Sequence, residues 1–242
     1  MSSVQDSLIL FPRSRRSQRV FVPIAREIAE RSKKRAAAFN NAAAERFQCG
    51  DLAQARQFLL RAATIRPECA VTAFNLGLVL QSSNQPEEAA TWYRRSIARF
   101  SDNAQAHFNL GFCLRSLGRK GESEAAFRAG LKIDPRRSDI FLVLGITCVE
   151  RGDHEAAARA FSRGLAIDAN HPTLHAYLGT ALKDLGDAEG AIAELKCALQ
   201  LDPRLEYARF NLVRALQLRR AQMSRALAPD AALPVSVEDD CI

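Results

Sequence analysis

The sequence predicts an all-α fold: an α-solenoid of tandem helix-turn-helix repeats with a C-terminal capping helix. One observation is that a leucine-glycine pair recurs every 34 residues. Another is that apolar residues three and four positions apart flank each pair, which is the spacing of one helix face. An internal period of this length is typical of arrays in which each repeat packs on its neighbours. The pairs begin at Leu76, Leu110, Leu144 and Leu178, and Ala42 with Ala43 replaces the pair in the first copy.

Each copy contains two amphipathic segments joined by a short turn. In the last copy the two segments carry Leu174, Leu178, Leu182 and then Ile192, Leu195, Leu199. The turn between them contains residues that tolerate a left-handed backbone, which ends a helix. These turns are Gly50-Asp51, Asn84-Gln85, Gly118-Arg119, Gly152-Asp153 and Gly186-Asp187. Each copy is therefore predicted to be a helical hairpin.

Glycines in the middle of the first segments predict close packing between the two helices of a copy. Glycine inside a helix costs roughly 1 kcal/mol relative to alanine, yet Gly77, Gly111, Gly145 and Gly179 all occupy this position. Small residues on both helices allow their axes to approach closely. A large residue recurs on the second segment to fill the remaining space: Leu59, Tyr93, Phe127, Phe161 and Leu195.

The order of Leu-Gly, Gly-Asp, alanine, an aromatic residue, a small residue and Asp-Pro resembles the tetratricopeptide repeat. Five copies fit this pattern, at residues 36–69, 70–103, 104–137, 138–171 and 172–205. The resemblance covers about 170 of 242 residues. It implies a right-handed α-solenoid in which the first helices line an inner groove. The tryptophan of the family pattern is replaced here by Phe39, Ala73, His107, Phe141 and His175.

Composition favours a chain without membrane spans in a reducing compartment. It is 48% hydrophobic and 25% charged, and no apolar run approaches the ~18 residues of a transmembrane helix. The six cysteines include no C-x-x-C pair, so neither a zinc site nor a disulfide framework is indicated. We expect a cytoplasmic protein without cofactors, with organelle targeting as the alternative.

Charge is concentrated toward the two ends of the sequence. Residues 1–35 carry nine Lys/Arg and three acids, and residues 226–242 carry four acids and no Lys/Arg. We expect a basic arm that becomes helical from about residue 23, because proline suits the first turn of a helix. The basic run at residues 13–19 leaves three interpretations: a solvated arm, a targeting peptide or, least favoured, a nucleic-acid patch. A further hypothesis is that residues 8–22 fold back into the groove.

Residues 206–225 predict one more first helix. An array needs a polar-faced helix to cover its last hairpin, so this segment is expected to be a cap. Residues 226–242 are expected to form an acidic flexible tail.

No group of residues indicates an enzyme or a bound metal. His171 and His175 have the spacing of a metal pair, but Pro172 places His171 before the helix begins. Two capping or inter-repeat histidines are therefore expected. Every glycine has a role in the repeat, which leaves no phosphate-binding loop.

Asparagines at position six of successive copies predict a ligand-binding ladder. They are Asn41, Asn75 and Asn109, and Tyr177 occupies the position in the fifth copy. An amide offers both a donor and an acceptor, which suits a peptide backbone of any sequence. Families of similar repeats use such ladders in this way. The alternative is that asparagine is simply common at this position.

Two further sets of residues extend the predicted site. Position nine gives an apolar strip, Leu78, Phe112 and Ile146, for which inter-repeat packing is the alternative. Asp139, Glu150 and Asp184 would favour a basic ligand end. The carboxylate clamp of heat-shock co-chaperones is excluded, because position two lacks lysine in every copy.

These features predict a non-enzymatic protein-interaction scaffold: an adaptor, assembly factor or co-chaperone that binds an extended peptide or a helix of a partner in its groove. The alternative is a regulatory or substrate-recruiting subunit of an enzyme complex. Nucleic-acid association through the basic arm is a weaker alternative.

Overall fold

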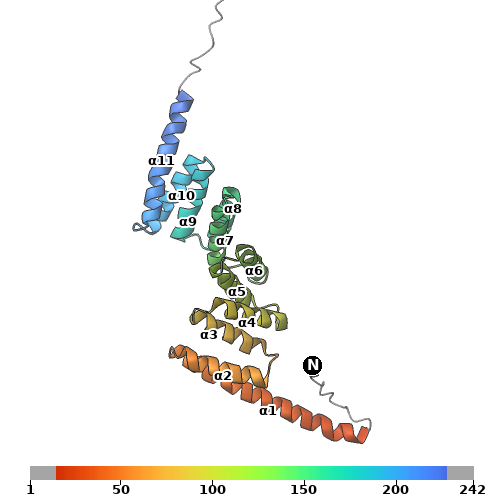
Figure 1. The fold of residues 1–242 in the computed structure, drawn as a ribbon. Helices are drawn as coiled ribbons and strands as arrows, with labels where there is room; N and C mark the ends of the chain where they lie inside the picture. Colours follow the sequence, from red (N-terminus) through yellow and green to blue (C-terminus); the bar gives the residue numbers. More distant parts are fainter. Residues whose placement is uncertain (1–14, 228–242) are drawn as a thin grey trace, which may run out of the picture. The chain divides into compact units, whose positions relative to one another are not determined.

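The computed structural model describes residues 15–227, and the side chains from residue 26 to 226. Within this part of the chain, all regular secondary structure is α-helical (Figure 1). The helices are α1 (Arg15–Gln48), α2 (Leu52–Ile65), α3 (Ala70–Ser82), α4 (Pro86–Arg99), α5 (Ala104–Ser116), α6 (Lys120–Ile133), α7 (Ser138–Glu150), α8 (His154–Ile167), α9 (Pro172–Asp184), α10 (Ala188–Leu201) and α11 (Glu206–Leu227). Residues 1–14 of the basic arm and residues 228–242 of the acidic tail lie outside the described residues.

The chain divides into two compact units, Met1–Ile133 and Asp134–Ile242. The first unit contains the helix pairs α1–α2, α3–α4 and α5–α6, and the second contains α7–α8, α9–α10 and the single helix α11. Within each unit every helix packs on the next one along the chain. The all-α prediction of stacked helical hairpins is confirmed.

The turns within the copies have the predicted left-handed backbone. Gly50, Gly118, Gly152 and Gly186 have φ between 73° and 86°, and Asn84 has φ 56°. The aspartate that follows three of these glycines begins the next helix. Its side chain accepts a hydrogen bond from a backbone amide three residues on, and satisfies one free donor of the first turn. These aspartates are Asp51, Asp153 and Asp187.

The glycines in the middle of the first helices allow the predicted close approach. A Cβ atom on Gly77 would lie 2.5 Å from the Tyr93 ring, and one on Gly111 would lie 2.6 Å from the Phe127 ring. Tyr93 and Phe127 are both buried. The cost of glycine in a helix is therefore offset by the burial of a large side chain on the paired helix.

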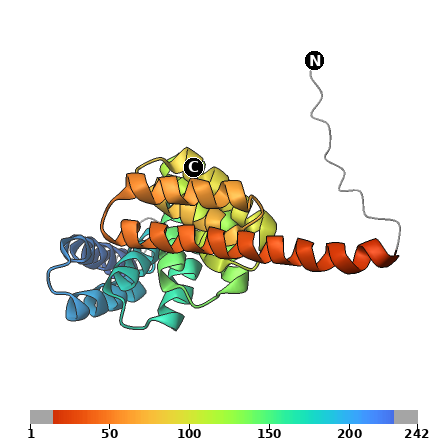
Figure 2. The same cartoon turned by 90° about the horizontal axis from the view of Figure 1, so that it is seen from below.

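The first helix is longer than the sequence indicated. It begins at Arg15, so Pro23 lies inside α1 and not at its start. Arginine and glutamine before Pro23 are good helix formers, whereas an interior proline removes one backbone hydrogen bond and its ring crowds the carbonyl four residues earlier. Figure 2 shows α1 extending past the end of α2.

The last helix packs on α9 and α10 through small residues. Ala208 and Ala215 are fully buried, and they belong to a cluster with Ala191, Leu195 and Ala198. The opposite face of α11 was expected to be polar. It instead exposes large apolar side chains, and Phe210 is 61% exposed.

Candidate functional site

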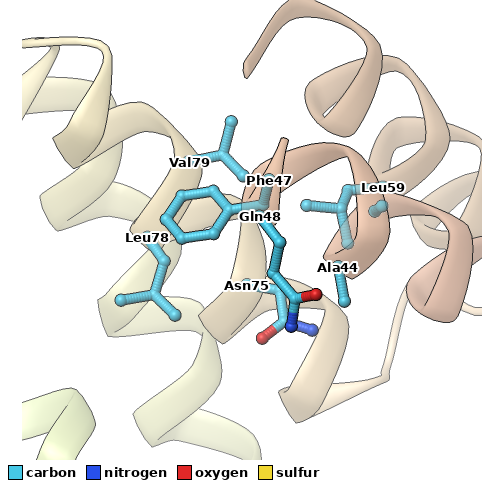
Figure 3. A pocket seen from close by; sticks show the side chains of 8 residues that line it. Ala44, Phe47, Gln48, Leu59, Asn75, Leu78 and Val79 are labelled. Atoms are coloured by element: carbon cyan, nitrogen blue, oxygen red, sulfur yellow. The ribbon is translucent and has the colours of Figure 1, made fainter. Parts of the chain in front are cut away.

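A small apolar pocket lies between the first helices of the first two copies. Its volume is about 150 Å³. Phe47 and Gln48 of α1 face Leu78 and Asn75 of α3 across it (Figure 3). Buried Ala43, Leu59 and Val79 complete the lining together with exposed Ala44. The pocket therefore has an apolar base, and its entrance is formed by exposed residues of α1.

Two amide side chains line this pocket beside its apolar residues. Gln48 is exposed and Asn75 is half-buried. The Asn75 side chain donates to Asn40 Oδ1 at 3.3 Å, and Asn40 donates to Thr72 Oγ1 at 2.9 Å. This hydrogen bonding joins α1 to α3 and fixes the position of Asn75. The Asn75 carbonyl oxygen accepts none of these bonds.

The three asparagines of the predicted ladder have different environments. Asn41 is exposed and Asn75 is half-buried, whereas Asn109 is buried at 6% exposure. Asn109 donates to the Tyr93 hydroxyl at 3.3 Å and accepts from Gln105 Nε2 at 2.9 Å. The hydroxyl of Tyr93 in turn donates to Gln81 Oε1 at 2.7 Å. Asn109 thus joins the two helix pairs of copies two and three, and only Asn41 and Asn75 are accessible to a ligand.

Burial also determines the acidity of the hydroxyl that Asn109 contacts. The pKa of Tyr93 is raised well above its ordinary value, because burial disfavours the phenolate. Tyr93 therefore stays neutral, and its hydroxyl proton remains available to Gln81. This arrangement is part of the core of the first unit.

The apolar strip at position nine also divides by role. Leu78 lines the pocket, whereas the ring of Phe112 packs edge-on against Phe127, with centroids 5.0 Å apart. Ile146 is half-buried against the Phe161 cluster of the second unit. Leu78 is therefore available to a ligand, whereas Phe112 packs within the first unit and Ile146 packs within the second.

The remaining predicted residues belong to the second unit. Tyr177 stacks on Phe161 and packs against Tyr207 of α11, with centroids 5.6 and 5.1 Å apart. Asp139 accepts two hydrogen bonds from Arg137, at 2.9 and 2.7 Å. These bonds hold the pKa of Asp139 below its ordinary value. Asp139 therefore stays negatively charged, and the guanidinium of Arg137 balances that charge.

Asp184 and Glu150, the other two acids predicted to favour a basic end of a ligand, differ in their surroundings. Asp184 lies 3.0 Å from Lys183 Nζ and 3.8 Å from His154 Nδ1. Glu150 is exposed at the end of α7. With Asp139, these acids lie in the second unit, whereas the three asparagines lie in the first.

The pocket residues on α1 were missed by the sequence analysis. Phe47 is at position twelve of its copy, where the other copies have Gln81, Arg115, Val149 and Lys183. An apolar residue at a position that is otherwise mostly polar is a signal that would have identified it. Its exposed fraction is 37%.

His171 and His175 have the expected capping and inter-repeat contacts. His171 Nδ1 accepts from the Leu174 amide at 3.3 Å, where α9 begins. His175 contacts Glu194 at 2.6 Å and the Ala169 carbonyl at 2.9 Å. Among residues 26–226 no group of His, Cys, Asp and Glu is arranged to hold a metal. None of the described helices is long and apolar enough to cross a membrane.

Comparison with known proteins gives one family and several solved structures. Residues 80–202, just over half of the chain, match the family model of the cilia and flagella-associated protein 70 middle TPR-like domain. The comparison with curated proteins found no match.

The similar solved structures share the fold at low sequence identity. MamA is 17% identical with a TM-score of 0.66, and the match covers 71% of this chain and 94% of MamA. YrrB, described as a TPR protein with an unusual peptide-binding site, is 18% identical with a TM-score of 0.66, covering 75% of this chain and 93% of YrrB. A tetratricopeptide repeat protein from Parabacteroides merdae is 15% identical with a TM-score of 0.66, covering 80% and 76%.

The helix pairs, their left-handed turns and their mid-helix glycines agree with these comparisons. A repeat of this kind is a protein-interaction fold. The chain belongs to the tetratricopeptide repeat family.

Proposed function

We propose that the chain is a non-enzymatic protein-interaction scaffold, acting as an adaptor, assembly factor or co-chaperone. It binds an extended peptide or a helix of a partner protein on the surface formed by α1 and α3. The observation that carries this proposal is the open apolar pocket lined by Phe47 and Leu78, with Gln48 and Asn75 beside them.

The pocket suits one apolar side chain of a ligand. A cavity of this volume accommodates a benzene-sized group, and full burial of such a side chain contributes about 1.5–3 kcal/mol. Gln48 and the carbonyl oxygen of Asn75 supply a donor and acceptors beside it, which fit the backbone of the same ligand. The site therefore favours an apolar residue without specifying its neighbours.

Similarity to YrrB supports the proposal at the level of the fold. YrrB is described as having a peptide-binding site, but at 18% identity only the architecture is shared. The pocket between α1 and α3 of this chain supplies the support for a ligand site.

The test compares partner capture by matched variants of the full chain. Phe47→Glu places a charge at the pocket, and Leu60→Glu is the control, since Leu60 is 43% exposed on α2 and does not line the pocket. After circular dichroism shows equal helicity, each immobilised protein is incubated with native lysate, and bound proteins are identified by mass spectrometry. We expect some lysate proteins to bind the Leu60→Glu variant and not the Phe47→Glu variant. Identical partner sets would exclude the pocket as the site.

A further inference from the structure

The last helix leaves an apolar stripe uncovered. Phe210 is 61% exposed, Val213 52% and Met223 57%, and Leu216 lies on the same side at 37%. The other side of α11 is the one that packs on α9 and α10, through Ala208, Asn211 and Ala215. We call Phe210, Val213 and Leu216 the α11 face.

This face matches the surface that a second helix covers in each complete copy. Phe210 has the same position in the 34-residue period as Phe108 of the third copy. Val213 has the same position as Gly111 and Gly179. In the third copy Phe108 packs against Gly130 of α6, and Gly111 packs against Phe127 of the same helix. In the fifth copy Gly179 packs against Leu195 of α10. Within the described residues, α11 has no following helix.

Val213 restricts which helix can occupy this face. A Cβ atom on Gly179 would come within 2.7 Å of Leu195 Cγ. Because Val213 carries a branched side chain in the place of that glycine, a helix packed here cannot present a large residue opposite it. It must present alanine or glycine there, with larger apolar residues one turn to either side to contact Phe210 and Leu216.

The positive charge of α11 indicates which kind of helix can bind the α11 face. The helix carries five arginines, Arg209, Arg214, Arg219, Arg220 and Arg225, and one acid, Glu206. Arg209 donates to the Pro203 carbonyl, and Arg219 lies 3.7 Å from Glu189. Arg214 lies beside the face, with its guanidinium 5.5 Å from the Phe210 ring centroid. Such a surface attracts an acidic helix and repels a second copy of itself.

We propose that an acidic amphipathic helix of a partner protein packs on the α11 face, in the place that the second helix occupies in each complete copy. A small residue of that helix faces Val213, and its glutamates or aspartates lie beside Arg214 and Arg220. This surface is separate from the pocket between α1 and α3.

The test uses synthetic helical peptides as probes. Each has the 14-residue length of α10, and the main probe has a leucine stripe with alanine at its centre and glutamates on both sides. One control peptide has lysines in place of the glutamates, and the other has phenylalanine in place of the central alanine. Binding to the full chain is measured by fluorescence anisotropy. We expect the acidic alanine peptide to bind at least tenfold more tightly than either control.

Variants of the protein then locate the binding surface. Phe210→Ser should weaken binding of the acidic alanine peptide at least tenfold, and Val213→Gly should allow the phenylalanine peptide to bind. Val71→Ser is the matched control, since Val71 is 61% exposed on α3 of the first unit, and it should change nothing. Lack of saturable binding, or equal binding of all three peptides, overturns the proposal.

A second copy of the chain or residues 228–242 could cover the α11 face instead. Either result would overturn the proposal. Light scattering would reveal a dimer that Phe210→Ser dissociates if a second copy covered the face. A chain ending at residue 227 would bind the acidic peptide at least tenfold more tightly than the full chain if residues 228–242 covered it. The expected results are a monomer and equal affinity for the two chain lengths.

Discussion

A single methyl group decides how closely the two helices of a copy can pack. We predict that Gly111→Ala destabilises the protein, because the new Cβ atom would lie 2.6 Å from the ring of buried Phe127. Overpacking of this kind costs about 1–3 kcal/mol, and the better helix propensity of alanine returns up to ~1 kcal/mol. Urea unfolding followed by circular dichroism measures the difference. Gly121→Ala is the control, since nothing lies near its Cβ position on α6, and it should be neutral or stabilising.

The stabilities of an Asn109 variant and an Asn41 variant should distinguish a structural asparagine from one that is accessible to a ligand. Asn109→Ala removes two hydrogen bonds from a buried position, and we predict a loss of about 1–3 kcal/mol in the free energy of unfolding. Asn41→Ala changes an exposed residue and should alter stability by less than about 0.5 kcal/mol. Thermal unfolding of the two variants checks this order. Equal losses would contradict the assignment of Asn109 to the core.

Asp139 provides a prediction about pH. The hydrogen bond from Arg137 lowers its pKa, so the folded state binds a proton less readily than the unfolded state. The stabilisation is therefore fully present above the ordinary aspartate pKa, and it is lost as the pH falls through the lowered value. Arg137→Gln should raise the pKa of Asp139, as measured by NMR titration of its carboxyl carbon. An unchanged pKa would show that the pair does not form in solution.

Residue-level sequence patterns could predict contacts within a copy better than contacts between copies. The close approach at Gly77 follows from a glycine at mid-helix and a large residue on the paired helix. The side chain of Asn109 donates to the hydroxyl of Tyr93 in the preceding copy, whereas the residues that match Tyr93 in copies three and four, Phe127 and Phe161, have no hydroxyl group. Position in the repeat alone makes Asn41, Asn75 and Asn109 appear equivalent. Their different environments arise only from packing.

At the scale of helices, three of the turns within copies end in an aspartate that caps the next helix. We predict that Asp187→Ala reduces stability by about 1 kcal/mol, because α10 loses the side chain that accepts from the Gly190 amide at 2.9 Å. Asp187→Asn is the control, because asparagine caps helices about as well. Chemical denaturation of the three proteins compares them. A large loss in the asparagine variant would indicate that charge, and not capping, provides the stabilisation.

Helix ends were more predictable than helix surfaces. Glycine and aspartate indicate a turn locally, so the sequence places the boundaries between paired helices well. The start of α1 depends on whether a helix continues through Pro23, which local preferences do not decide. The α11 face was also mistaken for a polar one, because arginines alternate with Phe210, Val213 and Leu216 along the sequence. Which of these side chains are covered depends on how α11 packs on α9 and α10.

At the scale of the molecule, the 34-residue period gives no sign of the division after Ile133. The period continues unbroken across that point, so the sequence predicts one array. The structure has two compact units, Met1–Ile133 and Asp134–Ile242. Four buried apolar clusters of the described residues each contain residues of one unit: the Tyr93 and Leu59 clusters lie in the first unit, and the Phe161 and Leu195 clusters lie in the second.

This confinement predicts that each unit folds without the other. In a repeat protein, stability is approximately the sum of repeat terms and interfaces between neighbours, and each of these four clusters is made of residues of a single unit. Separate fragments of residues 1–133 and 134–242 should both be helical and should unfold cooperatively by circular dichroism. In the full chain, Gly111→Ala should increase hydrogen exchange within the first unit and leave residues 134–227 unchanged. Faster exchange throughout both units, or an unfolded fragment, would mean that the two units depend on each other for stability.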